Sequence, residues 1–159
     1  MTGLAAEVIE RAAARRAHVA TAESCTGGLV AGALTGVPGA SAVLTHGVVA
    51  YANAAKIGLL GVDAGLIERH GAVSGEVAGA MAAGMARVSG AELAVSITGI
   101  AGPGGGSSAK PVGLVWFGLS AFGAVRTARE VFGGLDRDGV RQAAVEFALT
   151  MLRDALGDG

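Results

Sequence analysis

Ser24 stands where a nucleophile could act, in a short polar segment at residues 23–28 that separates two apolar stretches. The first stretch, 18–22, predicts a strand, and the second, 29–34, predicts a helix. A serine between them lies at the end of a sheet, beside the free N–H groups at the start of a helix. Three of these N–H groups could stabilise an oxyanion, those of Cys25, Thr26 and Gly27. The alternative is a serine that only caps the helix.

A nucleophilic serine needs a base, and Lys56 is the best candidate. If Asn53 caps a short helix, Lys56 falls in its first turn, where the positive end of the helix dipole disfavours an ammonium. A neutral lysine can accept a proton, and Tyr51 could relay that proton or orient the amine. None of the three histidines has an acidic residue at a recurring spacing: His18, His46 and His70. An ordinary surface lysine is the alternative for Lys56.

Cys25 is a competing nucleophile, because a thiol at a helix N-terminus has a lowered pKa; its other interpretation, which we favour, is a small buried apolar side chain. One cysteine and three scattered histidines lack the spacing of zinc ligands, so we expect neither a metal nor a cofactor.

A glycine-rich loop at residues 99–108 has no apolar periodicity and is not a P-loop, since it lacks the GxxxxGK[ST] pattern. Successive backbone N–H groups in such a loop can cradle a phosphate, and four glycines are candidates for that contact: Gly99, Gly102, Gly104 and Gly105. A phosphorylated ligand would also need nearby cations, for which the candidates are Lys110, Arg137 and Arg141. A flexible surface loop is the alternative.

Length and composition indicate the scaffold that must hold these residues. The chain has 159 residues, 52% of them hydrophobic but only 4% aromatic, with 28 glycines. We therefore expect one domain, residues 1–159, with a core of Ala, Val, Leu and Ile. The formal net charge of −1 offers no general attraction to nucleic acid or to an anionic membrane. The uncharged stretch 24–55 holds Pro38 and many glycines, which favours buried soluble structure over a membrane span. The lone cysteine and the charged N-terminal segment predict a cytoplasmic protein.

The pattern of apolar residues predicts alternating helices and strands. Strands are expected at 18–22, 43–51, 93–98, 112–120 and 125–132, and helices at the N-terminus, at 29–34, around Lys56, at 64–69, at 75–88 with Ser74 as N-cap, and at 138–156. The last two strands are too close in sequence for a crossover helix and should form an antiparallel hairpin. The fold class is therefore α/β, a three-layer α/β/α sandwich with a mixed sheet.

Five segments resemble, in the same order, the C-terminal domain of the CinA (competence/damage-inducible protein) family: 21–28, 51–56, 71–74, 96–105 and 110–113. The resemblance covers nearly the whole chain, and stand-alone members of the family include the PncC nicotinamide-nucleotide amidases. It implies hydrolysis of the carboxamide of nicotinamide mononucleotide to nicotinate mononucleotide and ammonia, in pyridine-nucleotide recycling.

By the same resemblance Ser24 would be the nucleophile, Lys56 the general base, Tyr51 an assisting hydroxyl and Thr98 a residue that contacts the substrate. The family usually reads close to Ser-Gly-Asp-Arg after the position of Phe132, whereas residues 133–137 are one residue longer here. Whether Arg137 or Arg141 meets the phosphate therefore stays open.

Two other functions remain alternatives. One is an amidase acting on another small amide or pyridine nucleotide, and the other is a non-catalytic nucleotide-binding or interaction module linked to competence or DNA damage. We expect a small nucleotide substrate and no direct binding of nucleic acid or membrane, and the chain is compatible with a homodimer.

Overall fold

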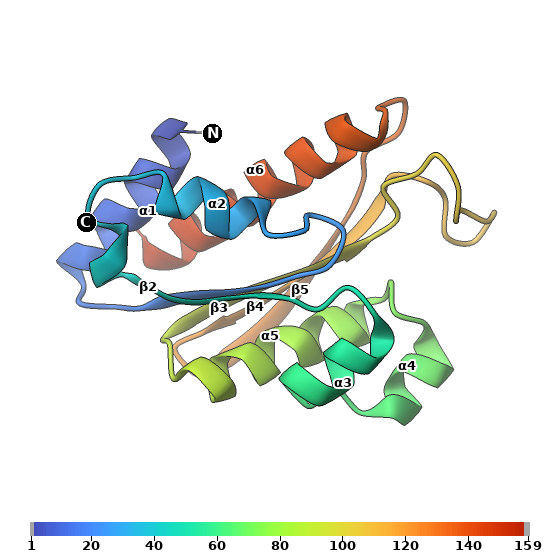
Figure 1. Ribbon diagram of the computed structural model, residues 1–159, viewed down its shortest axis with the longest axis horizontal. Coiled ribbons are helices and arrows are strands. Elements are labelled where there is room, and N and C mark those ends of the chain that lie inside the picture. The colour runs from blue at the N-terminus through green and yellow to red at the C-terminus, as the bar shows by residue number, and fades with distance from the viewer. Residues whose placement is uncertain (1, 158–159) are drawn as a thin grey trace.

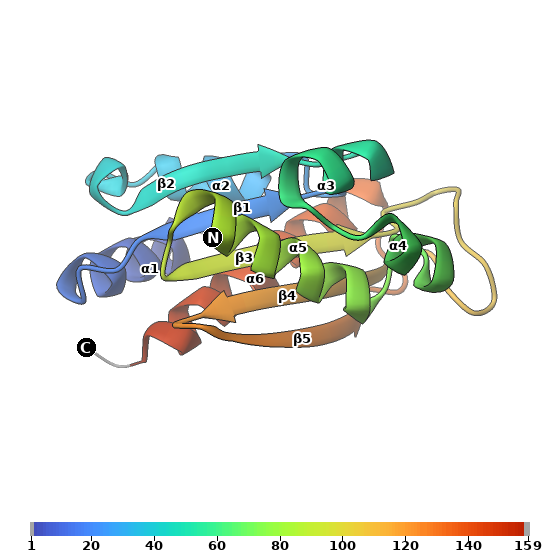
Figure 2. The same cartoon turned by 90° about the horizontal axis from the view of Figure 1, so that it is seen from below.

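A five-stranded mixed sheet forms the middle layer of the computed structural model, which describes residues 2–157. Its strands are β1 (Val19–Glu23), β2 (Leu44–Val49), β3 (Leu93–Gly99), β4 (Leu114–Ala121) and β5 (Ala124–Val131), in the spatial order β2-β1-β3-β4-β5. β1 runs parallel to β2 and β3, whereas β4 is antiparallel to both β3 and β5. The three parallel strands end at one edge of the sheet, from which the glycine-rich loop after β3 projects (Figure 2). Parallel strands that end together bring their following loops together.

Helices cover both faces of the sheet (Figure 1). One face carries α1 (Thr2–Ala14), α2 (Leu29–Thr35) and α6 (Arg137–Leu156), and the other carries α3 (Asn53–Leu60), α4 (Ala64–His70) and α5 (Gly75–Ser89). A 3-10 turn, η1 (Ala40–Ala42), precedes β2. The three-layer α/β/α sandwich, the mixed sheet and the hairpin of β4 and β5 predicted from the sequence are confirmed. None of the helices within residues 2–157 combines the length and the apolar character needed to cross a membrane.

The sheet separates two apolar cores. Larger side chains such as Ile97 and Phe117 pack towards α1, α2 and α6, whereas small ones such as Ala22 face α5. Because these strand residues are small, α5 lies very close to the sheet: a Cβ at Gly118 would collide with the carbonyl oxygen of Ala78 and with the hydroxyl of Ser96. The loop before α5 lies over the end of β3, where the hydroxyl of Thr98 donates to the carbonyl oxygen of Ala72.

Three details at helix starts bear on the site. Ser74 caps α5 as predicted, accepting a hydrogen bond from the N–H of Val77. Asn53 does not cap α3: Ala52 is the N-cap, without a side-chain bond, and Asn53 is the first helical residue. The last helix begins at Arg137, with Asp136 as its capping residue, so Arg137 belongs to the first turn of α6 and not to the loop before it.

Candidate active site

Ser24 follows β1 directly and continues its hydrogen bonding with β3. Its N–H donates to the carbonyl oxygen of Ile97 at 2.9 Å, so Ser24 lies across from Thr98 at the ends of neighbouring parallel strands. The chain then turns sharply, and the N–H of Gly27 closes the turn on the carbonyl oxygen of Ser24 at 3.0 Å. Gly27 and Gly28 have φ of +60° and +97°, which side chains rarely adopt. Glycine at both positions lets α2 begin directly after the turn.

Glu23 holds this turn from the inside. Its fully buried carboxylate accepts five hydrogen bonds, from the hydroxyls of Thr21 and Thr26 and from the N–H groups of Gly28, Val30 and Ala31. The last three belong to the N-cap and first turn of α2, so the expectation that α2 offers free N–H groups to an oxyanion is wrong. This role of Glu23 was not predicted from the sequence, although an acidic residue shortly before the start of a helix is a feature that indicates it.

The N–H groups left for an anion lie in the turn itself. Within residues 2–157, the N–H groups of Cys25 and Thr26 carry no hydrogen bond to another residue, whereas that of Gly27 is engaged. The N–H of the residue after a nucleophile commonly contributes to an oxyanion hole. Two of the three predicted donors therefore have the capacity to bind an oxyanion.

Lys56 is almost fully buried, with 1% of its surface exposed, and its amine meets the serine. Nζ lies 3.3 Å from Oγ of Ser24, 3.0 Å from the carbonyl oxygen of Ala50 and 3.1 Å from that of Tyr51. Burial lowers the pKa of Lys56, because desolvation penalises the ammonium. A neutral amine keeps two N–H donors, which the two carbonyls can take, and its lone pair is then left for the hydroxyl proton of Ser24.

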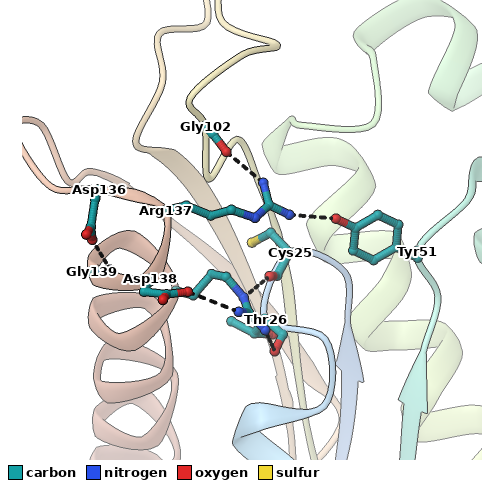
Figure 3. A network of polar contacts seen from close by, with 9 residues as sticks. Cys25, Thr26, Tyr51, Gly102, Asp136, Arg137, Asp138 and Gly139 are labelled. Carbon is teal, nitrogen blue, oxygen red and sulfur yellow. Dashed lines mark hydrogen bonds and ion pairs between the residues drawn. The ribbon is translucent and has the colours of Figure 1, made fainter.

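Tyr51 contacts the lysine in a different way from the expected relay. Its carbonyl oxygen binds Lys56, but its phenol oxygen accepts a hydrogen bond from Arg137 at 3.1 Å, and 58% of the residue is exposed. A second guanidinium nitrogen of Arg137 donates to the carbonyl oxygen of Gly102 at 2.7 Å (Figure 3). Arg137 thus connects α6 to the glycine-rich loop and to the end of β2.

The thiol of Cys25 is buried, and its environment differs from that of a reactive cysteine. Desolvation raises the pKa of this thiol from 9.0 to about 11, with a smaller contribution from the nearby charge of Glu23. A thiol with this pKa is protonated at neutral pH and is a poor nucleophile. Burial thus outweighs any effect of the helix start, which favours the other interpretation of Cys25, a small buried apolar side chain.

A cavity of about 300 Å³ joins these groups, which is at the lower end of the range for small-molecule sites. Most of the predicted site residues line it: Ser24, Cys25, Tyr51, Lys56, Thr98, Gly99, Gly102, Gly104, Gly105 and Arg137. Asn53 also lines the cavity and was not predicted to do so. The buried hydroxyl of Thr98 donates to the carbonyl oxygen of Ala72 at 2.8 Å.

Two predicted cations lie outside this cavity. Lys110 donates to the carbonyl oxygen of His70 at 2.6 Å and lines a neighbouring hollow beside Trp116. Arg141 donates to the carbonyl oxygens of Cys25 and Thr26. Among the predicted cations only Arg137 therefore faces the glycine-rich loop from within the cavity. In the described part of the chain, no three His, Cys, Asp or Glu side chains gather as a metal site would require.

Known proteins are similar to this chain over nearly its whole length. The model of the CinA C-terminal domain matches residues 1–156. A nicotinamide-nucleotide amidohydrolase PncC of Enterobacter agglomerans is 52% identical over 138 residues, which cover 86% of this chain and 84% of that protein. A CinA-like protein of Anaeromyxobacter dehalogenans is 55% identical over 94% of this chain, which spans only 36% of the length of that relative.

A solved structure extends the likeness to three dimensions. The competence/damage inducible protein CihA of Agrobacterium tumefaciens superposes with a TM-score of 0.94 at 46% identity, covering 99% of this chain and 95% of that one. Sequence and structure agree over nearly the same residues, and the chain belongs to the CinA C-terminal domain family.

Proposed function

We propose that this chain is an amidase that hydrolyses the carboxamide of nicotinamide mononucleotide to nicotinate mononucleotide and ammonia, with Ser24 as nucleophile and Lys56 as general base. The observation that carries the proposal is the buried amine of Lys56, held by two carbonyl oxygens and 3.3 Å from Oγ of Ser24 in a cavity. The PncC relative, which is similar over most of its own length, supports the choice of substrate.

In the first half of the proposed reaction, Oγ of Ser24 attacks the carboxamide carbon while Lys56 takes the hydroxyl proton. The N–H groups of Cys25 and Thr26 stabilise the oxyanion. As this intermediate collapses, the C–N bond breaks, and the proton on Lys56 passes to the leaving nitrogen, which departs as ammonia. Ser24 is left as an ester of the pyridine carboxylic acid.

In the second half, water attacks the ester and gives a proton to Lys56. The C–O bond to Ser24 breaks, Lys56 returns the proton to Oγ, and the acid product loses its own proton to solvent. Lys56 is neutral at the start of each half and protonated in the middle, so a lowered pKa favours both halves.

The phosphate of the substrate has a natural partner in Arg137. This guanidinium now donates to a carbonyl oxygen and a phenol, both neutral acceptors that a phosphate can replace with a stronger, charge-assisted bond. Gly102, Gly104 and Gly105 line the cavity beside it, and their N–H groups are the candidates for the other phosphate oxygens. Lys110 has no part in this proposal.

The experiment is to incubate the purified protein with nicotinamide mononucleotide and a chelator, and to follow ammonia and nicotinate mononucleotide. We expect both products in equal amounts, and none with Ser24→Ala. The non-phosphorylated riboside and a panel of simple aromatic amides test the substrate. Turnover of another amide with none of the nucleotide would contradict the proposed substrate, and equal activity of Ser24→Ala would contradict the mechanism.

A further inference from the structure

Arg141 lies one turn into α6 and, unlike Arg137, does not reach the cavity. Its side chain is 27% exposed, and its guanidinium is directed at the turn that follows Ser24. Nε donates to the carbonyl oxygen of Cys25 at 3.1 Å, and a terminal nitrogen donates to that of Thr26 at 3.5 Å, as Figure 3 shows for these two carbonyls. The other terminal nitrogen lies 3.5 Å from the exposed carboxylate of Asp138.

These two carbonyls belong to peptide units that matter for an oxyanion. In a planar trans peptide, the carbonyl oxygen of one residue and the N–H of the next point in opposite directions. A cation on the carbonyl of Cys25 therefore fixes the direction of the N–H of Thr26 and polarises it, which strengthens it as a donor. The contact with Thr26 acts in the same way on Gly27, whose N–H closes the turn on Ser24.

Two charged side chains thus divide the polar groups of this turn. Glu23 takes the N–H groups at the start of α2, and Arg141 takes the carbonyl oxygens of Cys25 and Thr26. Next to Ser24, the N–H groups of Cys25 and Thr26 make no hydrogen bond to another residue within residues 2–157. Binding of a phosphate would not require Arg141 to contact the carbonyl oxygens of Cys25 and Thr26, so these contacts indicate a different role.

We propose that Arg141 is a positioning residue of the Ser24 turn: by holding the carbonyl oxygen of Cys25 it orients and polarises the N–H of Thr26, an oxyanion donor, and by holding the carbonyl oxygen of Thr26 it orients the N–H of Gly27 that closes the turn on Ser24. The inference rests on the proposed function, because it assumes that Ser24 attacks a carbonyl carbon. The sequence left open which of the two arginines meets the phosphate. In this proposal Arg137 acts on the phosphate end of the substrate, and Arg141 acts on the reacting end.

The test compares Arg141→Gln and Arg141→Lys with Arg137→Gln on the nucleotide and on the riboside. For Arg141→Gln we expect kcat to fall about 10- to 100-fold on both substrates with KM within about threefold, less than the loss of a whole oxyanion donor. Arg141→Lys should lie between Gln and wild type, because an ammonium keeps the positive charge but lacks the planar fork whose separate nitrogens reach the two carbonyls. Arg137→Gln should raise KM for the nucleotide alone. The matched control is Arg126→Gln, since Arg126 also donates to a backbone carbonyl, that of Met151, away from the site.

A second measurement separates positioning from simple folding effects. Pyridine-3-boronic acid forms a bond between boron and Oγ of Ser24, with the serine proton passing to Lys56, and leaves a tetrahedral anion that mimics the intermediate. We expect Arg141→Gln to weaken the binding of this probe at least tenfold, with Ser24→Ala as the blank. A merely structural role would reduce the folded fraction and leave the affinity of the folded molecules unchanged.

Three results would overturn the inference: unchanged boronate affinity in Arg141→Gln, an effect on the nucleotide but not on the riboside, or no Ser24-dependent binding of the boronate to wild type. If wild type binds the boronate through Ser24 but does not turn over nicotinamide mononucleotide, the proposed function fails, and the boronate affinities still decide the role of Arg141.

Discussion

Replacing Lys56 with methionine removes the amine that would accept the proton and keeps a side chain that fills the same space. Methionine has a side chain of similar length without the amine, so the three contacts of Nζ, to Ser24, Ala50 and Tyr51, are lost together. General-base catalysis contributes about 10²- to 10⁴-fold to a rate. We therefore expect kcat/KM to fall about 10³-fold, which corresponds to about 4 kcal/mol in the activation free energy.

The same exchange should leave the protein folded. It removes a buried amine, whose desolvation is unfavourable, but leaves the carbonyl oxygens of Ala50 and Tyr51 without a donor, at about 1–3 kcal/mol each. The two effects oppose one another, and we expect the free energy of unfolding to fall by about 1–2 kcal/mol, a minor part of the about 5–15 kcal/mol of a typical domain. Urea unfolding measures this change beside the kinetics.

The assay is the release of ammonia from nicotinamide mononucleotide, measured as initial rates over a range of pH. Because only the neutral amine accepts a proton, kcat/KM of wild type should rise with pH through the lowered pKa of Lys56. Lys56→Arg keeps the positive charge but cannot deprotonate, so it should be as inactive as Lys56→Met. Adding Ser24→Ala to Lys56→Met should cost little more, since the two groups act as a unit.

Two outcomes would refute this reasoning. A Lys56→Met protein that keeps more than about a tenth of the wild-type kcat/KM would show that another group takes the proton, because a general base is worth about 10²-fold or more. An active Lys56→Arg protein would show that the charge matters and the proton transfer does not.

Three further predictions concern Cys25, Glu23 and the stability of the buried lysine. Cys25→Ala should keep kcat/KM within about threefold, and alkylation of wild type by iodoacetamide, followed by mass spectrometry, should accelerate as pH approaches about 11; full loss of activity in Cys25→Ala would contradict a serine nucleophile. Glu23→Gln should lower the free energy of unfolding by about 2–4 kcal/mol in urea, because an amide cannot accept all five hydrogen bonds. Folding lowers the pKa of Lys56 below 10.5, so at any pH between the pKa of the folded protein and that of the unfolded chain, the unfolded chain binds more protons. The free energy of unfolding of wild type, relative to that of Lys56→Met, should therefore rise with pH between these two pKa values and be lowest below them. A difference between the two proteins that does not change with pH would argue against the lowered pKa.

Much of the fold follows from local patterns that the sequence displays directly. The two residues between β4 and β5 leave no room for a crossover helix, which dictates the antiparallel pair and hence the mixed sheet. The meeting of Ser24 with Lys56 also follows in part, because Ser24 comes directly after β1 and Lys56 lies in the helix that follows β2, and the ends of parallel strands gather at one edge of the sheet. The prediction that Asn53 caps α3 is wrong, because capping depends on the backbone angles at Ala52, which local composition does not determine.

The division of labour between Arg137 and Arg141 could not be predicted in the same way. Residues four apart lie on one side of a helix, a single turn from each other, so periodicity cannot say which of them reaches the cavity. The answer depends on where α6 begins, at Arg137, and on how it lies against the Ser24 turn. Similarly, Glu23 is just one acidic residue in the sequence, and its five donors are assembled only when β1 and α2 have folded together.

The carboxylate of Glu23 also has a consequence for how a product would leave. An uncapped helix start is a durable binding site for a carboxylate, and hydrolysis of an amide generates one beside Ser24. Here the N–H groups of that helix start are already occupied from within the protein, so the newly formed anion finds no such resting place at the reacting end. In the proposed reaction, the buried glutamate would thus keep the acid product from binding to the start of α2.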